Sequence, residues 1–539
     1  MSLDEPFDCP PDPERMIEGL RDTGYEFDTA IADIVDNSIA ANATRVDLQL
    51  AMDFRGNIRL SIADNGDGMD LDGLKNAMRY GAKKRPNPAS LGKYGLGLKT
   101  ASTAFCRSLT LVSRPSAVDK PLSATWDLDH VAKVQSWSLL LSDDPDEEAL
   151  QHLETVASNH SGTVVVWEKV DRLMNKDYQH KGGKPAQRAL EKRVDGLRQH
   201  LAMIYQRFLD TGDERARNVK ISLNDVTLKA WDPFVRGLSE LIAKDTIEAE
   251  NTSGEPAEFT VRAYTLPRRE EFPTPQLAKE AMLSSERQGI YVYRENRLIH
   301  ESDWLGLYQK EPHFTLLRVE FSFDHKLDDA FQLDIKKSQI ILDEALASWL
   351  QDQFLPAPRR EADRRYREGQ RKETQKKAQG AHDTSNTNIK DHEAAAGGAK
   401  VSVTNPGANE AEVENAHGKF KLKIAVRSAD KPGEVFIKAV DSITNGLLFE
   451  PAIIEQNRAV LINTSHPYYR KVYVPNFNRS VTMQGMDSLM WALAVGELST
   501  MRGDKTQELF LDMRYEVSRI LEKLVEGLPE PEMEQDAAA

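Results

Sequence analysis

Cysteine is nearly absent from this chain of 539 residues, which holds only Cys9 and Cys106. Two cysteines are too few for a disulfide framework or a cysteine-rich zinc site, so a reducing compartment is expected. Long apolar runs are missing too, since no stretch approaches the roughly 18 apolar residues that a membrane span needs. The acidic, proline-rich N-terminus lacks the apolar segment of a signal peptide. These absences predict a soluble, cytoplasmic protein.

The chain also lacks an excess of basic residues. Lys and Arg total 70 against 85 Asp and Glu, which gives a formal net charge of −15. This balance argues against a protein coated in nucleic acid, although it allows one local basic patch. Hydrophobic residues make up 40% of the chain and charged residues 29%, an ordinary globular composition. At about 150 residues per domain, the length predicts three or four units.

Changes in residue pattern divide the chain into four segments. Helical and strand patterns alternate with glycine-rich stretches over residues 14–172 and continue with a different character over residues 173–356. Residues 357–419 begin with mixed charges and then, from Ala378 on, contain no Phe, Trp, Tyr, Leu or Met. A segment with so little to bury cannot offset its ordering entropy, so we expect a charged, flexible linker. Order is expected to resume in a C-terminal domain over residues 420–528.

The first polar pair lies on an amphipathic helix predicted for Thr29–Ser38. Asp33 and Asn37 are four residues apart, so both project from one face of that helix. A carboxylate beside a carboxamide suits a metal–phosphate site, because the amide oxygen can bind Mg²⁺ while the carboxylate polarises a water. Taken alone, the pair is more simply a solvated helix face.

A second motif follows a predicted strand that ends in Asp64. An aspartate at a strand end can accept a hydrogen bond from an exocyclic amine, and Gly66 and Gly68 let the backbone before Met69 approach a flat ring. A calcium loop of the EF-hand type would need Glu at its twelfth position, where this chain has Lys75. A plain turn is the remaining alternative for this motif alone.

A third motif places Gly92, Gly95 and Gly97 before a helical pattern that contains Lys99. Successive backbone N–H groups and a helix N-terminus could hold phosphates there. The motif is not a P-loop, because Leu98 follows the last glycine, and its glycine spacing runs in the opposite order to the dinucleotide fingerprint. By itself, a glycine-rich turn of this kind is weak evidence for phosphate binding.

The order and spacing of these motifs, followed by Thr163 near the start of a later strand, resemble the Bergerat-fold ATPases. That superfamily holds gyrase-type topoisomerases, MutL, the MORC proteins, histidine kinases and large heat-shock chaperones. The resemblance covers roughly residues 15–170 and is closest to prokaryotic MORC-like and MutL-like ATPases. It implies an α+β fold: a nucleotide domain with a mixed sheet and helices on one face, a transducer-like α/β domain, and a small α+β C-terminal domain.

The same resemblance implies that ATP and Mg²⁺ are bound and gives each motif a role. Asp33 would be the general base and Asn37 would bind Mg²⁺. Asp64 would read the adenine amino group, with Thr163 beside it. A short basic lid would span Tyr80–Leu91. The adenine base would be lined by Gly66, Gly68 and Met69, and the phosphate end of the lid would be formed by Gly92, Gly95, Gly97 and Lys99.

The second segment resembles the transducer domain of the MutL, MORC and topoisomerase branches. Strands are predicted at residues 289–293 and 317–323, from the alternation of apolar and polar residues. In those branches a lysine reaches the γ-phosphate and would stabilise charge on the transferred group. Lys337 is the candidate here, with Lys336 as its alternative. A pair of lysines at a strand-to-helix turn is the simpler interpretation.

Two positions depart from the family pattern. Asp33 stands where the family usually has Glu, and its side chain is one methylene shorter. A general base must come within about 2.6–3.2 Å of its proton, directly or through a water, so hydrolysis is expected to be slow. Ala40 stands where many members carry an acidic residue. Nucleotide binding is therefore better supported than turnover.

We expect a conformational clamp that binds and hydrolyses Mg-ATP and forms a homodimer on ATP binding. The resemblance implies action on DNA, or with partner proteins in a genome-maintenance or defence assembly. The segment Arg359–Lys377, with nine basic and four acidic residues, could contact phosphates or could be a solvated helix of mixed charge. The alternative function is a non-hydrolysing ATP sensor or scaffold that presents its C-terminal domain to a partner protein.

Overall fold

The computed structural model falls into two compact units, Met1–Ala362 and Asp363–Ala539. Each unit is described by itself. Within the described part of the chain, no helix has both the length and the apolar character needed to cross a bilayer. The structure describes residues 11–22, 24–82, 87, 89–91, 97–174, 182–250, 255–328, 331, 344–378 and 380–529.

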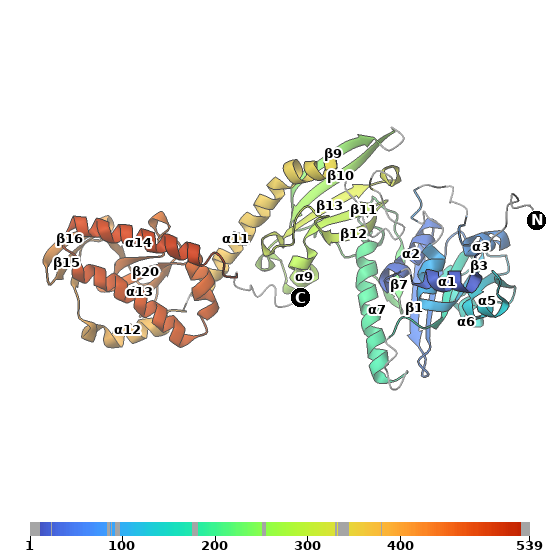
Figure 1. Cartoon of the computed structure of the whole chain (residues 1–539), viewed down its shortest axis with the longest axis horizontal. Helices are drawn as coiled ribbons and strands as arrows, with labels where there is room; N and C mark the ends of the chain where they lie inside the picture. The colour runs from blue at the N-terminus through green and yellow to red at the C-terminus, as the bar shows by residue number, and fades with distance from the viewer. Residues whose placement is uncertain are drawn as a thin grey trace, which may run out of the picture. The chain divides into compact units, whose positions relative to one another are not determined.

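A mixed eight-stranded sheet forms the centre of the first domain in unit 1 (Figure 1), in the order β5-β4-β3-β6-β2-β1-β7-β8. Neighbouring strands are antiparallel, apart from the parallel pair β1 and β7. Because β7 and β8 belong to this sheet, the first domain continues past the expected boundary at residue 172. The strands are Arg45–Met52 (β1), Ile58–Asp64 (β2), Cys106–Arg114 (β3), Leu122–Asp127 (β4), Leu140–Ser142 (β5), Gly162–Val170 (β6), Lys220–Leu223 (β7) and Val226–Thr227 (β8).

Alternate residues of the strands pack against helices on opposite faces of this sheet. Val165 and Trp167 of β6 join the large core that includes most of the helices, whereas Val164 and Val166 pack with α6 on the other face. The α+β fold class is confirmed, with α6 as an addition to the helices expected on one face. The helices are Pro13–Arg21 (α1), Phe27–Ala40 (α2), Leu71–Met78 (α3), Gly97–Phe105 (α4), Leu128–Val134 (α5), Glu147–Ala157 (α6), Lys184–Ile204 (α7) and Gln206–Leu209 (α8).

The second domain of unit 1 is built on a five-stranded sheet in the order β12-β11-β13-β10-β9. Its strands are antiparallel, except that β11 and β13 run parallel. The strands expected at residues 289–293 and 317–323 are β11 and β13. The elements are Glu240–Glu250 (β9), Pro256–Thr265 (β10), Pro275–Glu280 (α9), Gly289–Arg294 (β11), Arg297–Asp303 (β12), Leu317–Phe323 (β13), Glu344–Trp349 (α10) and a π-helix at Leu350–Phe354. Helix Pro356–Ala378 (α11) begins in unit 1, but most of its residues belong to unit 2.

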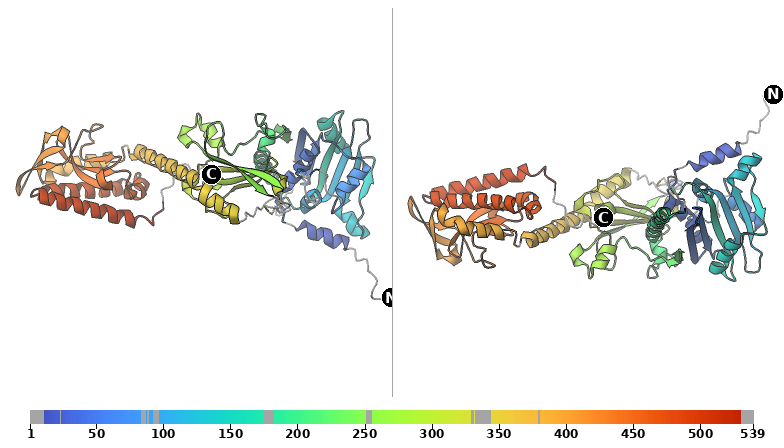
Figure 2. Two further views of the ribbon diagram at one scale, coloured as in Figure 1. Left: turned by 90° about the horizontal axis from the view of Figure 1, so that it is seen from above. Right: turned by 90° about the horizontal axis from the view of Figure 1, so that it is seen from below.

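Unit 2 holds a three-stranded sheet, β14-β15-β16, and a four-stranded sheet, β17-β19-β20-β18. In both views of Figure 2, the red helices α13 and α14 lie on one side of the orange strands. The elements are Asp383–Ala396 (α12), Lys400–Asn405 (β14), Glu410–Asn415 (β15), Gly418–Lys423 (β16), Ala425–Arg427 (β17), Ile437–Val440 (β18), Phe449–Ile454 (β19), Asn457–Asn463 (β20), a π-helix at Tyr469–Tyr473, Ser480–Thr500 (α13) and Asp504–Leu524 (α14).

The expected flexible linker, residues 357–419, is instead largely helix and strand. Its small apolar side chains supply the reason. Ile389 of α12 is 4% exposed, and Ala411 and Val413 of β15 are fully buried. Ala411 and Val413 pack against larger side chains from later in the chain, such as Leu498 on α13, and Ile389 packs in a separate cluster with Trp491 of the same helix. The amino-acid composition of the segment alone does not predict this burial.

Candidate active site

Helix α2 carries polar side chains into the interior of the first domain. Asp33 is only 6% exposed, which excludes a solvated helix face at this position. The Tyr25 hydroxyl donates to Asp33 Oδ2 at 3.1 Å, and Asn37 Nδ2 donates to the Asp33 backbone carbonyl at 2.8 Å. A buried carboxylate costs free energy unless it is well bonded, so its presence here points to a chemical role.

Asp64 is buried at the end of β2, within reach of α2. Ser38 Oγ donates to Asp64 Oδ2 at 2.7 Å, and the Gly66 N–H donates to Oδ1 at 2.9 Å. Burial raises the pKa of Asp64, and the hydrogen bonds from Ser38 and Gly66 oppose that shift. The Thr163 backbone N–H is a third donor to this carboxylate, which has about four lone-pair sites, so one site could accept from a ligand amine. Sequence reasoning missed Ser38, although it directly follows Asn37 on the same helix.

Thr163 lies opposite Asp64 in the ladder between β6 and β2, which is the placement that the sequence predicts. Ser113 of β3 connects it to the turn after β2. The Met69 N–H donates to Ser113 Oγ at 2.9 Å, and that oxygen lies 2.8 Å from Thr163 Oγ1. No local motif surrounds Ser113, because only the strand register of the folded sheet brings it here. It extends the polar chain from Asp64 to Met69.

The turn after β2 is packed so tightly that only glycine fits. A Cβ added at Gly66 would lie 2.5 Å from the Ala41 carbonyl oxygen. Gly68 has φ of +67°, and a Cβ there would lie 1.9 Å from the Arg114 carbonyl oxygen. These glycines hold the turn against the end of α2 and the end of β3. The turn is therefore a built feature of the fold, since a loose surface loop would accept larger residues.

The N-terminus of α4 lies against the buried carboxylate of α2. A Cβ added at Gly97, the first residue of α4, would lie 3.3 Å from Asp33 Oδ2. Backbone N–H groups at a helix start, next to this acid, could receive phosphate oxygens. The structure thus gathers three separated motifs around α2: Asp33 with Asn37, the turn after Asp64, and the start of α4.

The sequence comparisons agree with this geometry. Residues 25–163 match the family model described as "Histidine kinase-, DNA gyrase B-, and HSP90-like ATPase". The resemblance of this domain to the Bergerat-fold ATPases is confirmed. We call residues 25–163 the Bergerat domain.

Three curated relatives are similar to the chain over 89 residues. They include ATPase MORC2B of Mus musculus and ATPase MORC2 of Homo sapiens, both 35% identical over a stretch that is 16% of this chain and 9% of the relative. A crystal structure of the N-terminal domain of a DNA repair protein covers 66% of this chain and 98% of its own, at 15% identity and a TM-score of 0.36. So low a score does not establish a shared overall fold, and the likeness to the MORC ATPases is confined to a small part of their length.

The donor set of the Bergerat domain fits a magnesium ion. Asn37 offers an amide oxygen one helical turn from the Asp33 carboxylate, and Mg²⁺ prefers oxygen ligands completed by waters and substrate phosphates. Gly97 keeps a side chain away from the Asp33 carboxylate, and Gly66 and Gly68 let the turn after Asp64 pack against the ends of α2 and β3. Asn37 would hold the ion, whose charge would offset that of the phosphates.

Lys99 has a different environment from the one expected of a phosphate ligand. Its side chain is 2% exposed, and Nζ donates to the Ala77 carbonyl near the end of α3 at 3.0 Å. The cation therefore ties α4 to α3, and its contact with phosphate stays a prediction. The predicted site residues outside the described part of the chain are Gly92, Gly95, Lys336 and Lys337.

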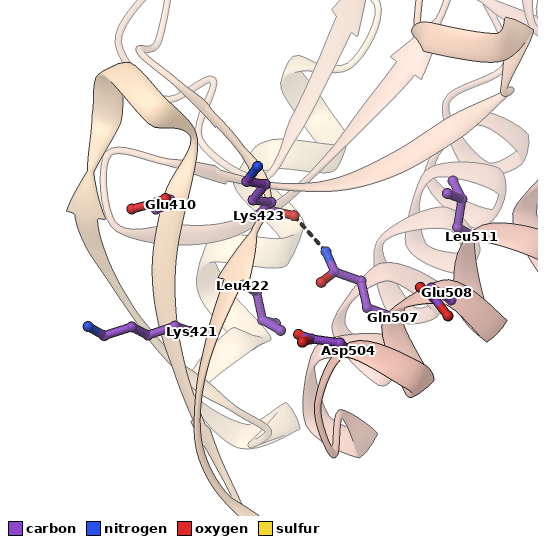
Figure 3. Close-up of a pocket in the computed structure, with 8 residues that line it drawn as sticks. All are labelled: Glu410, Lys421, Leu422, Lys423, Asp504, Gln507, Glu508 and Leu511. Carbon is purple, nitrogen blue, oxygen red and sulfur yellow. Dashed lines mark hydrogen bonds between the residues drawn. The ribbon is translucent and has the colours of Figure 1, made fainter.

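A groove of about 530 Å³ lies in unit 2 between β16 and α14 (Figure 3). Lys421 and Lys423 line one part of it, and Asp504 and Glu508 line the other. All four side chains are exposed, and two are cations while two are anions, so the groove favours no single class of charged ligand. The candidate active site is the cluster around α2.

Proposed function

We propose that this chain binds Mg-ATP in its Bergerat domain and hydrolyses it to ADP and phosphate. The observation that carries the proposal is the meeting of three separated motifs at α2. Asp33 lies beside the start of α4, Ser38 on the same helix bonds to Asp64, and the glycine turn after Asp64 closes the cluster. The family match over residues 25–163 and the similarity to MORC ATPases over 89 residues support this assignment.

Each side chain has a specific task in the proposed reaction. Asp64 accepts a hydrogen bond from the adenine amino group, which orients the nucleotide. Asp33 takes the proton from the water that attacks the γ-phosphorus, while the bond from that phosphorus to the bridging oxygen breaks and ADP leaves. Asn37 holds the magnesium ion against the phosphates. Lys337, or Lys336, supplies a further positive charge to the γ-phosphate.

The proposed cycle is that of a clamp, in which ATP binding favours a homodimer and hydrolysis releases it. DNA or partner proteins of a repair or defence assembly are the proposed targets. Helix α11 gives DNA contact little support. Its bases form ion pairs within the helix, such as Arg364 with Glu368 at 3.2 Å and Arg367 with Asp363 at 3.0 Å. Paired charges of this kind are typical of a solvated helix, so they leave less free positive charge for phosphates.

The proposal is tested by measuring ATP affinity and phosphate release for the wild type and for Asp33→Asn and Asp64→Asn. Asp33→Asn should bind ATP within about threefold of the wild type and lose turnover by about 100-fold or more, because a general base contributes 10²–10⁴-fold. Asp64→Asn should lose binding, because the carboxamide presents a donor to the adenine amine. Asp67→Asn, in the same loop but with its carboxylate bonded to Asn42 in an exposed position, is the matched control.

A second function has one observation in its favour. Asp33 is the shorter acid, and its Oδ2 already accepts a bond from Tyr25. If the wild type binds ATP in a manner that needs Asp64 but releases no phosphate, the chain is an ATP sensor or scaffold. If Asp64→Asn binds ATP as tightly as the wild type, both nucleotide functions are wrong.

A further inference from the structure

The turn between β11 and β12 brings an arginine of the second domain to the helix of the active site. Arg297, the first residue of β12, is 3% exposed, and its Nε donates to Asp36 Oδ1 at 3.0 Å. Asp36 is fully buried and lies on α2 between Asp33 and Asn37. The two charges are 261 residues apart in sequence. This buried ion pair joins the second domain to the helix that carries the proposed catalytic groups.

Tyr205, just after α7, is the third member of this contact. Its hydroxyl lies 2.7 Å from both Asp36 Oδ1 and the Ala32 carbonyl, so it donates to one of them at a time. Burial would by itself lower the pKa of Arg297, but the carboxylates of Asp36 and, further on, Asp33 more than offset this, so the pKa is raised. Arg297 is therefore a permanent cation that interacts with Asp36 and Asp33 of α2.

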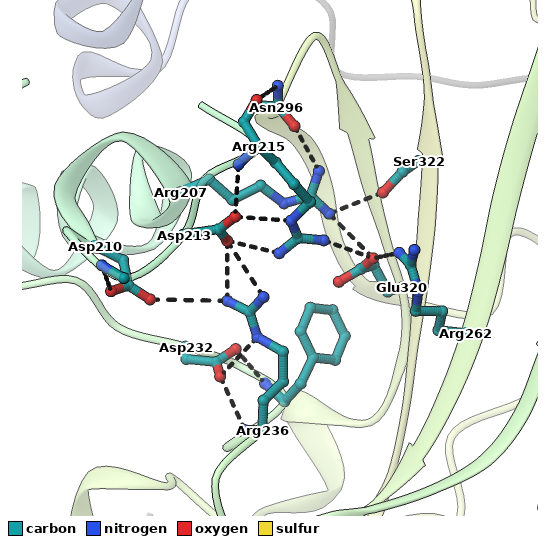
Figure 4. A network of polar contacts seen from close by, with 12 residues as sticks. Arg207, Asp210, Asp213, Arg215, Asp232, Arg236, Arg262, Asn296, Glu320 and Ser322 are labelled. Carbon is teal, nitrogen blue, oxygen red and sulfur yellow. Dashed lines mark hydrogen bonds and ion pairs between the residues drawn. The ribbon is translucent and has the colours of Figure 1, made fainter. Parts of the chain in front are cut away.

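The same β-hairpin is anchored on its other side by a network of arginines and carboxylates (Figure 4). Glu295 and Asn296 both have positive φ, as a tight two-residue hairpin turn requires. Asn296 Oδ1 accepts from Arg207 at 3.0 Å, and its Nδ2 donates to the Arg215 carbonyl at 2.7 Å. Arg207 and Arg215 also pair with the buried Glu320 of β13. The turn is therefore fixed to Arg207 of α8 in the first domain and, through Glu320, to the five-stranded sheet.

A second arginine of the hairpin contacts the predicted lid. Arg294, the last residue of β11, pairs with Asp328 at 2.6 Å, and its Nη1 donates to the Ser90 carbonyl at 3.4 Å. Ser90 lies at the end of the residues predicted as a lid. Two arginines from one rigid hairpin thus reach two parts of the Bergerat domain, with the stronger contact on α2.

We propose that Arg297 is a positioning residue that transmits the placement of the second domain to α2 through Asp36. A shift of the hairpin would pull on the buried carboxylate and turn the helix, which would move Asp33 and Asn37 together. The inference rests on the proposed ATPase function and deepens it. It assigns the coupling to an ion pair outside the nucleotide site, whose residues touch neither the adenine nor the phosphates in the proposed reaction.

The test compares Arg297→Met, Arg297→Lys and Asp36→Asn with the double variant Asp36→Asn/Arg297→Met. Arg297→Met should lower kcat about 10- to 100-fold, because small misplacements of catalytic groups cost this much, while the ATP affinity changes less than about threefold. Arg297→Lys should recover part of the lost rate. The double variant should be no slower than either single variant, because both act through one contact.

Hydrogen exchange of the α2 amides, measured without nucleotide, is the readout that does not depend on activity. Exchange should be faster in Arg297→Met than in the wild type, because α2 loses a tertiary contact. Arg318→Met is the matched control. Arg318 is also a fully buried arginine of the second domain, but it donates to the carbonyls of Pro233, Ala281 and Met282 within that domain. The Arg318→Met variant should lower the free energy of unfolding without changing the hydrogen exchange of α2 or the kcat of the folded protein.

Two results would overturn the coupling: equal loss of kcat in Arg297→Met and Arg318→Met, or unchanged exchange of α2 in Arg297→Met. The failure of the proposed function looks different. A wild type that binds ATP without releasing phosphate refutes the ATPase, while faster exchange of α2 in Arg297→Met would still support the ion pair as the contact that holds the helix. If the single variants are too unstable to purify, the double variant removes both buried charges and allows the same exchange measurement.

Discussion

The buried carboxylates of the two units have different neighbours. Asp33 of unit 1 lies beside Gly97, the first residue of α4, where the absence of a side chain leaves the helix start next to the carboxylate. Asp487 of unit 2 is fully buried against His382, whose two ring nitrogens bond to Asp487 Oδ2 at 2.8 Å and to the Tyr469 hydroxyl at 2.9 Å. Both clusters are polar and buried. The difference lies in what surrounds each acid. Asp33 faces the start of a helix, whose backbone N–H groups could receive a ligand, whereas Asp487, His382 and Tyr469 bond to one another, which is typical of a structural role.

The largest expected effect comes from a side chain added to the tightly packed turn after Asp64. Gly68→Ala would place a methyl group 1.9 Å from the Arg114 carbonyl oxygen, at a backbone φ of +67° that alanine adopts poorly. The turn after Asp64 must then move away from β3, and we expect ATP affinity to fall by about 100-fold or more, since a displaced base-binding turn loses several hydrogen bonds and contacts. Titration with a fluorescent ATP analogue measures the loss.

Gly81→Ala separates the strain of a positive φ from the clash. Gly81 has φ of +71°, but a Cβ there would meet nothing within 4 Å. It should bind ATP within about threefold of the wild type and lose only about 1 kcal/mol of stability. Equal loss of affinity in both variants would contradict the argument that the tight turn after Asp64 builds the nucleotide site.

A smaller effect, on stability, is expected at the cluster of Asp487, His382 and Tyr469 in unit 2. Asp487→Ala leaves His382 without its carboxylate, and breaking a buried polar pair in this way costs about 3 kcal/mol. Hydrogen exchange of α12 and α13 in the full chain should rise, while ATP affinity stays unchanged. Asp391→Ala, an exposed acid on α12, is the control and should alter neither quantity. A loss of ATP affinity in Asp487→Ala would show that this cluster serves more than the fold of unit 2.

Sequence alone predicts those parts of the site whose chemistry lies within a short stretch of chain. Asp33 and Asn37 share a helix face, and the glycine turn follows Asp64 directly, so residue spacing alone predicts that these groups lie together. The alternation of residues at β11 and β13 predicted two strands for the same reason. The roles of these side chains in binding and hydrolysis remain predictions that the proposed experiments test.

The rest depends on contacts that no local pattern contains. Ser113 joins the site through strand register, and the Arg297–Asp36 pair joins segments 261 residues apart. The strand β7 enters the first sheet from beyond the expected domain boundary, because its partner β1 lies far back in the chain. Composition alone does not predict the helices and strands of residues 357–419, because Ile389, like the other small apolar residues there, is buried by side chains outside the segment.

The smallest effect is a pH dependence of stability, because unit 2 also holds a buried acid whose loss of hydration outweighs its ion pair with an arginine. Burial raises the pKa of Glu497 from 4.5 to about 7, and Arg514, 3.4 Å away, opposes this only in part. Between these values the folded chain keeps a proton that the unfolded chain has lost, so the free energy of unfolding falls as pH rises from about 5 to 7. At 1.36 kcal/mol per unit the loss reaches at most about 3 kcal/mol. Urea unfolding across this pH range measures the loss of stability. The loss should occur in the wild type and in Glu508→Gln, a control at an exposed acid, but not in Glu497→Gln. Parallel pH profiles for Glu497→Gln and the wild type would show that this buried acid does not govern the stability of unit 2.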